Sequence, residues 1–296
     1  MQRSIATLVF SSAVALCACS SKEAAKPDSA AATQAGAGTA NANASFDPTT
    51  RVATVIAKEF AFVGPDSITA GWTTFRMKNE GTVLHHVAIA RIDSGKTMTD
   101  VEAALKNPGP PPAWLVGVGG PNAPDPGAES NATLNLQPGQ YVMLCFVDIP
   151  GNVPHFAKGM VHPLVVTAAS GSTGTEPTAD ATITLADYSF AVDGKLTAGK
   201  HTIKVLDNGP QEHEVEIVRL APGKTMKDFG AWAVKKEGPP PASALGGVVG
   251  ISKAAGANYF DVDLTPGNYA LLCFIPDAKD GKAHIEHGMV KEFRVE

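Results

Sequence analysis

The chain has 296 residues, 44% hydrophobic and 18% charged, which is enough for two ordinary domains with well-filled cores. A formal charge of −5 gives no basic surface for nucleic acid, and no central stretch is apolar for long enough to span a bilayer. The 29 glycines and 22 prolines, with short runs of Val, Ile, Thr and Phe between them, favour short strands joined by turns.

The N-terminus is typical of an export signal, with a positive start at Arg3 and a short apolar core from Ile5 to Leu16. The run from Leu16 to Cys19 resembles the lipobox of bacterial lipoproteins. That resemblance implies cleavage before Cys19 and lipidation of its sulfur, and Ser20 in the next position favours the outer membrane. The alternative is an ordinary secretory signal cut elsewhere. Both readings predict a protein that works outside the cytoplasm, on the periplasmic side of the outer membrane or at the cell surface.

Two low-complexity stretches divide the rest of the chain. Residues 20–45 and 168–178 are rich in Ala, Ser, Thr and Gly, and such segments bury too little apolar surface to offset their ordering entropy. The predicted organisation is a signal peptide (1–18), a flexible tether (19–46), a first domain (47–168), a linker (169–178) and a second domain (179–296).

The two domains are repeats at an offset of 128 residues, which makes each one domain-sized copy of a duplication. One residue is gained in the last loop, where the offset becomes 129. Matching positions include Arg91 and Arg219, Gly95–Met98 and Gly223–Met226, and Pro138–Tyr141 and Pro266–Tyr269.

Each half is predicted to be mainly β. In the first half we expect strands at residues 52–62, 72–78, 86–92, 132–136, 141–146 and 164–167. A helical insert is expected at residues 97–106, capped by Thr97, with a counterpart at about 225–236. Pro-rich runs at 109–112 and 238–241 then end these helices. Many short strands in about 110 residues indicate a β-sandwich.

One cysteine remains in each half once the signal region is set aside. Cys145 and Cys273 could form a disulfide, lie buried as inert thiols or bind a metal. A disulfide is geometrically awkward, because the two cysteines hold the same position in separate domains. Strand alternation places Tyr141, Met143 and Cys145 on one face, so the thiol is expected to point into the sandwich.

Each cysteine belongs to a repeated constellation. A His stands 60 residues before it, a second His follows after nine or ten intervening residues, and a Met lies five residues beyond that His. Two imidazoles, a thiolate and a thioether form the ligand set of a blue copper centre. Its appearance in matching register in both halves indicates a metal-binding function.

Both halves resemble cupredoxins, the plastocyanin–azurin family of Greek-key β-sandwiches. The pattern Gly-x-Tyr-x-x-x-Cys…His-x-x-x-Gly-Met stands at Gly139–Met160 and Gly267–Met289. The resemblance implies an all-β fold of two tandem cupredoxin-like sandwiches, each with a short helical insert, and up to two type 1 coppers per chain. The implied ligands are His85, Cys145, His155 and Met160 in the first half, and His213, Cys273, His284 and Met289 in the second.

The repeat itself selects among competing histidines. His86 is matched by Glu214, His287 by Lys158 and His162 by Lys291, so none of these three recurs in both halves. The acidic residues on either side of His213, together with the longer loop, make the second site the weaker prediction.

The resemblance has two departures from small blue copper proteins. The Cys-to-His loop is longer, although copper nitrite reductases have a loop of nearly this length. Phe146 and Phe274 follow the cysteines, and Leu144 and Leu272 precede them, where multicopper oxidases and nitrite reductases place a His that connects to a catalytic copper. These neighbours argue against an enzyme.

The expected function is therefore electron transfer by a membrane-tethered copper protein. The residues around the loop histidines, Pro154 and Phe156 in the first half, are consistent with an apolar patch that docks a redox partner protein. Two alternatives remain: a copper-handling protein and a metal-free cupredoxin-like interaction module.

Overall fold

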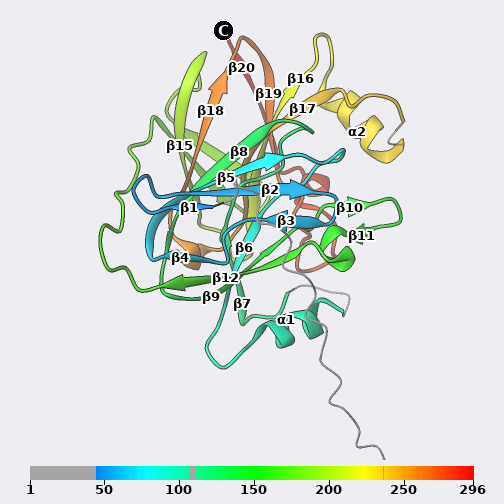
Figure 1. Cartoon of the computed structure of the whole chain (residues 1–296). Coiled ribbons are helices and arrows are strands. Elements are labelled where there is room, and N and C mark those ends of the chain that lie inside the picture. The colour runs from blue at the N-terminus through cyan, green and yellow to red at the C-terminus, as the bar shows by residue number, and fades with distance from the viewer. Residues whose placement is uncertain (1–44, 107–110, 236) are drawn as a thin grey trace, which may run out of the picture. The chain divides into compact units, whose positions relative to one another are not determined.

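The computed structural model describes residues 45–106, 111–235 and 237–296 (Figure 1). The predicted signal peptide, Cys19, most of the predicted tether and part of the first Pro-rich run lie outside the described residues. Residues 40–296 form one compact unit. In the part of the chain that is described, no helix combines the length and apolarity needed to cross a membrane.

The described chain is mostly β-strand. The first half contributes β1 (Phe46–Asp47), β2 (Val52–Lys58), β3 (Ala61–Val63), β4 (Ser67–Thr69), β5 (Gly71–Asn79), β6 (Ala88–Ile92), β7 (Leu115–Gly119), β8 (Glu129–Leu136), β9 (Gly139–Leu144), β10 (Asp148–Ile149), β11 (Val153–Pro154) and β12 (Val161–Thr167). The second half contributes β13 (Ala181–Ala186), β14 (Ser189–Asp193), β15 (Gly199–Asp207), β16 (His213–Leu220), β17 (Ala242–Ile251), β18 (Asn258–Leu264), β19 (Gly267–Leu272) and β20 (Val290–Val295).

The helices are short. They are α1 (Met98–Leu105) and α2 (Met226–Lys235), with the 3-10 turns η1 (His155–Lys158), η2 (Lys253–Ala255) and η3 (His284–His287). Thr97 caps α1 in a capping box with Asp100, and Thr225 makes the same hydrogen bonds with Asp228 before α2. Both predicted helices and the predicted cap are confirmed.

Two nine-stranded sheets form the sandwich, and each runs through both halves. One has the order β1-β2-β5-β8-β18-β15-β13-β14, with β3 on β2, and the other has the order β20-β19-β16-β17-β7-β6-β9-β12-β4. The halves join where β8 pairs β18 and where β7 pairs β17. The predicted all-β sandwich is confirmed, and the two repeats share their sheets.

Strand alternation divides the buried residues into an inner and an outer set. Tyr141, Met143 and Cys145 belong to the main core between the sheets, as predicted. Val142 and Leu144 point the other way and pack with residues of α1 in a separate cluster. Each helix therefore covers the outer face of the sheet that ends at the cysteine.

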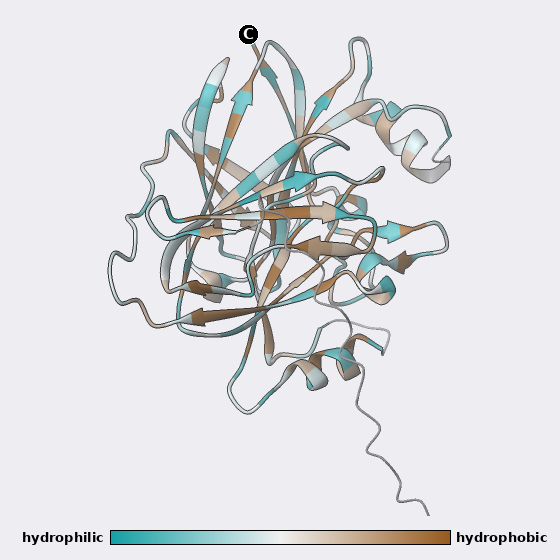
Figure 2. Cartoon of the chain, in the orientation of Figure 1, coloured by the Kyte–Doolittle hydropathy of each residue, from teal (hydrophilic) through white to brown (hydrophobic). Residues whose placement is uncertain are grey.

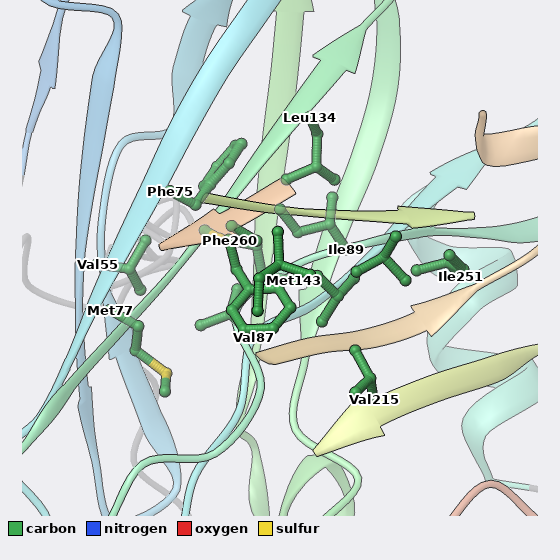
Figure 3. Close-up of a cluster of buried hydrophobic side chains, with 14 of the residues drawn as sticks. Val55, Phe75, Met77, Val87, Ile89, Leu134, Met143, Val215, Ile251 and Phe260 are labelled. Carbon is green, nitrogen blue, oxygen red and sulfur yellow. The ribbon is translucent and has the colours of Figure 1, made fainter. Parts of the chain in front are cut away.

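The main core is also continuous between the halves. Figure 3 shows Met143 and Ile89 of the first half among Val215, Ile251 and Phe260 of the second, and all belong to one buried cluster. Hydrophobic residues lie mainly on the strands, whereas the connecting loops are mostly hydrophilic (Figure 2).

Strand boundaries differ from the prediction in two places. The expected strand at 52–62 is two strands, β2 and β3, because the chain turns at Glu59 and Phe60, where Phe60 has φ 60°. The strand expected from residue 86 begins at Ala88, which leaves His85 and His86 in the preceding loop.

Candidate metal centre

The loop from Cys145 to Met160 folds back on itself through backbone hydrogen bonds. Phe156 N donates to Cys145 O at 2.9 Å, Met160 N donates to His155 O at 3.1 Å, and Cys145 N donates to Met160 O at 3.3 Å. Gly159, with φ 103°, ends the η1 turn in the left-handed region. This path places His155 and Met160 beside the cysteine at the end of β9.

The upstream histidine reaches the same place from a turn between β5 and β6. Asn79 organises that turn: its Oδ1 accepts from Gly81 N at 3.0 Å, and its Nδ2 donates to Val83 O at 2.8 Å. His85 packs over Gly81, where an added Cβ would lie 2.5 Å from the His85 Nε2. Glycine at this position therefore makes room for the imidazole.

Three of the predicted ligands converge on one point in the first half. Nδ1 of His85 lies 3.0 Å from Nδ1 of His155, which lies 3.4 Å from Cys145 Sγ. All three residues are fully buried, as is Met160. Within the described residues they form a group whose ligand atoms lie within 4.8 Å of one another.

The chemistry of this group fits a soft metal ion such as copper. Nε2 of His85 and Nε2 of His155 are buried without a hydrogen-bond partner, so both rings commit their Nδ1 atoms to the shared point. Burial lowers the pKa of His85 to about 4, with the neighbouring His155 acting in the same direction, and burial also lowers the pKa of His155. Burial raises the pKa of Cys145 to about 11, so the thiol is inert until a cation stabilises its thiolate.

The second half repeats half of this geometry. Cys273 Sγ lies 3.4 Å from His284 Nδ1, as in the first site, and Met289 is fully buried. The rings of His213 and His284 have their centroids 4.8 Å apart, but His213 Nδ1 lies 3.0 Å from Asp207 Oδ1. The third ligand is therefore near the site but directed at a carboxylate.

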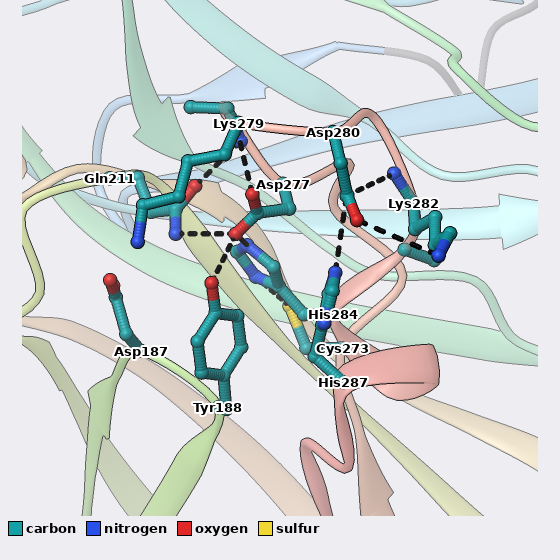
Figure 4. Close-up of polar contacts among 12 residues, drawn as sticks. Asp187, Tyr188, Gln211, Cys273, Asp277, Lys279, Asp280, Lys282, His284 and His287 are labelled. Atoms are coloured by element: carbon teal, nitrogen blue, oxygen red, sulfur yellow. Dashed lines mark hydrogen bonds and ion pairs between the residues drawn. The ribbon is translucent and has the colours of Figure 1, made fainter.

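Acidic residues surround the second site. Nε2 of His213 lies 3.3 Å from Asp187 Oδ1, and Nε2 of His284 lies 3.7 Å from Asp277 Oδ2. Figure 4 shows Asp277 held by Tyr188, at 2.5 Å, and by Gln211, at 3.1 Å. Burial raises the pKa of Cys273, and the charge of the nearby Glu214 acts in the same direction.

An aromatic residue packs on the loop histidine of each site, and the sequence analysis did not single it out. Phe60 makes an edge-on contact with His155 at 5.2 Å between centroids, and Tyr188 makes the same contact with His284 at 5.6 Å. Both have φ near 60°, which is unusual for a bulky residue. Their spacing of 128 residues was the available signal.

The remaining predicted and competing residues have other surroundings. His86 accepts a hydrogen bond from Phe146 N at 2.9 Å, His162 pairs with Asp66, and His287 pairs with Asp280. Cys145 and Cys273 are both free.

The sequence matches no protein-family model and no curated protein. Among solved structures, auracyanin of the photosynthetic bacterium Roseiflexus castenholzii is 23% identical, with 40% of this chain and 97% of that chain covered and a TM-score of 0.28. Auracyanin A, a "blue" copper protein of Chloroflexus aurantiacus, is 21% identical, with 39% and 99% covered and a TM-score of 0.28. A copper nitrite reductase of Nitrosomonas europaea is 15% identical, with 83% and 93% covered and a TM-score of 0.25. At these identities and scores, the nature of the site is argued from the chain's own residues.

Proposed function

We propose that this chain is a membrane-tethered, extracytoplasmic electron carrier that binds type 1 copper through His85, Cys145, His155 and Met160. The observation that carries the proposal is the convergence of two imidazole Nδ1 atoms and one thiol in a fully buried site. A thiolate with two imidazoles suits copper, and a thioether supplies a weak fourth ligand that tunes the potential.

The protein's part is to hold these ligands still. Bound copper supplies one-electron chemistry. Burial keeps His85 and His155 neutral at pH 7, so no proton competes for their Nδ1 atoms. The backbone hydrogen bonds between Cys145, Phe156 and Met160 fix the loop, which limits rearrangement when the charge at the site changes.

A second copper is proposed for His213, Cys273, His284 and Met289. The 3.4 Å approach of Cys273 to His284 is the same as that of their counterparts in the first half. His213 has to turn its Nδ1 away from Asp207 to complete this site.

We propose a carrier and not an enzyme. The side chains that follow the cysteines, Phe146 and Phe274, have no atom that could bind a second metal. Phe146 is instead part of an exposed apolar rim with Val83 and Leu84, where the three side chains are 36%, 41% and 37% exposed. Apolar surface of this kind suits brief docking of a redox partner protein.

Attachment to the membrane would come from lipid on Cys19. The tether that follows would let the copper sites reach a partner near the outer membrane or at the cell surface. Cys19→Ser should move the protein from the membrane fraction to the soluble fraction and abolish labelling by a fatty-acid probe.

The decisive experiment loads the purified protein with Cu(II), counts copper per chain and records the visible spectrum. An intense thiolate-to-copper band at two coppers supports the two-site carrier. Cys145→Ser and Cys273→Ser should each remove about half of the band. A band that bleaches and returns over repeated redox cycles without loss of copper distinguishes a carrier from a copper-handling protein. No band and no retained copper would leave a metal-free interaction module as the better account.

A further inference from the structure

A buried polar side chain holds the residue that follows each cysteine. In the first half, His86 Nε2 accepts from Phe146 N at 2.9 Å. His86 directly follows His85, and Phe146 directly follows Cys145. This one side chain is thus attached, through one peptide bond at each end, to two of the proposed ligands.

The second half uses a different side chain for the same purpose. Glu214 Oε1 accepts from Phe274 N at 2.7 Å, and these two residues directly follow His213 and Cys273. His86 and Glu214 hold the same position of the repeat, and each reaches a backbone N–H 60 residues further along the chain.

Asn122 connects the two side chains across the junction of the halves. Its Nδ2 donates to Glu214 Oε2 at 3.2 Å, and its side chain also hydrogen bonds to His86. Because His86 Nε2 is an acceptor, the neutral ring carries its proton on Nδ1, which leaves that atom to donate to the amide oxygen. Ala123 N, at 2.9 Å from Asn122 Oδ1, fixes the amide orientation.

The resulting chain of hydrogen bonds is nearly closed to solvent. His86 is 8% exposed, Asn122 is 3% exposed and Glu214 is 4% exposed. Burying three polar side chains where two sheets join costs more than an apolar contact would, unless every group is paired. His86, Asn122 and Glu214 are paired with one another and with the two backbone N–H groups.

We propose that His86, Asn122 and Glu214 form a bridge that passes an electron between the two cysteine loops. This inference rests on the proposed function, because it requires copper in both halves. Tunnelling falls off less steeply along covalent and hydrogen bonds than across van der Waals gaps, and this bridge makes a bonded connection between Phe146 and Phe274. One electron leaves Cu(I) in one half and reduces Cu(II) in the other, and no bond is broken and no proton moves.

The test measures electron transfer within the copper-loaded full-length protein. Single-site variants Cys145→Ser and Cys273→Ser provide the reference spectrum of each site. After a reducing pulse, the exchange of absorbance between the two bands gives a rate that should not depend on protein concentration. Asn122→Leu should slow this rate by about tenfold or more, with the spectrum and potential of each site unchanged.

Two further variants make the result specific. Asn131→Ala removes a different pair of hydrogen bonds between the halves, with Asp261 at 2.9 and 2.8 Å, and should leave the rate unchanged. His86→Leu interrupts the bridge from the other end and should slow the rate as Asn122→Leu does, which keeps the test available if one variant folds poorly. In the copper-free protein, Asn122→Leu should also speed hydrogen exchange at the amides of Phe146 and Phe274.

An unchanged rate in a folded, fully loaded Asn122→Leu protein overturns the electron route and leaves the proposed carrier intact. A slower rate accompanied by shifted potentials overturns it as well, because the bridge would then only position the ligands. A wild-type protein without the thiolate band overturns the carrier and the route together.

Discussion

Asp207 Oδ1 lies 3.0 Å from Nδ1 of His213, at the position of the repeat that Asn79 holds in the first half. Asn79 donates to backbone carbonyls instead, and Nδ1 of His85 is free to meet His155 at 3.0 Å. A single exchange of an amide for an acid thus separates a histidine that faces its fellow ligand from one held by a carboxylate.

We expect the reciprocal exchange of these two residues to shift the two potentials in opposite directions. Asp207→Asn should raise the reduction potential of the second site, and Asn79→Asp should lower that of the first. A carboxylate beside a histidine ligand makes the ligand more basic and favours Cu(II), and each tenfold change in relative affinity corresponds to about 60 mV for one electron. Redox titration of each band in single-site variants measures both shifts.

Asp187 provides an internal control for this exchange. It lies 3.3 Å from the other ring nitrogen of His213, so Asp187→Asn should raise the same potential to a smaller extent. Shifts of both sites in one direction would show that Asn79 and Asp207 act through the fold and not through their histidines.

The glycines beneath the upstream histidines should be specific to their own sites. A Cβ added at Gly81 would lie 2.5 Å from His85 Nε2, and one added at Gly209 would lie 2.3 Å from His213 Cε1. Gly81→Ala should therefore weaken copper binding at the first site by about tenfold or more and spare the second, with the reverse for Gly209→Ala.

Copper titration followed by the visible band, in single-site variants, measures this effect. Gly230→Ala, with no atom within 4 Å of the added Cβ, is the matched control and should bind copper normally at both sites. Equal losses at both sites from Gly81→Ala would contradict a local steric cause.

The sequence predicted the parts of the site that depend on local patterns. Alternation along the strand before Cys145 placed its side chain in the core, and the duplicated Cys–His–Met spacing placed His155 and His284 beside the thiols. The all-β sandwich followed from short strands and frequent turns. These inferences needed only neighbours in the chain and the repeat.

The parts that were missed depend on contacts between distant segments. Glu212, Glu214 and Glu216 were weighed as a reason to doubt the second site, but they alternate along one face and hydrogen bond to residues of the first half. A row of acids in one sequence does not say which backbone N–H groups it will meet. Phe60 and Tyr188 were missed because their positive φ is a property of the folded turn.

The apolar rim of the first site should govern electron exchange between molecules. Val83 is 41% exposed, and its counterpart in the repeat is Gln211. Val83→Gln should lower the electron self-exchange rate by about tenfold, because docking would no longer bury an apolar side chain worth on the order of 1 kcal/mol. Line broadening in spectra of half-reduced protein measures the rate.

Val165→Gln is the matched control for the rim. Val165 is 45% exposed on β12 and lies outside the proposed rim, so its replacement should leave the rate unchanged. Similar slowing by both variants would point to a general effect of surface polarity.

Glu216 should make the copper-free fold less stable as the pH rises. Its side chain is buried and accepts from Ala123 N at 3.1 Å and Gly246 N at 3.2 Å, and burial, followed by the charge of Glu214, raises its pKa well above 4.5. Above pH 4.5 the unfolded chain has lost this proton while the folded chain keeps it, so the stabilisation is complete below that pH and is lost as the pH rises. The free energy of unfolding should fall by about 1.4 kcal/mol per pH unit for this one proton until the folded state also releases it. Denaturant unfolding at several pH values should give a shallower decline for Glu216→Gln than for the wild type, whereas Glu292→Gln, at an exposed position, should follow the wild type. Parallel curves for Glu216→Gln and the wild type would mean that the folded protein already holds Glu216 as a carboxylate, satisfied by its two backbone donors.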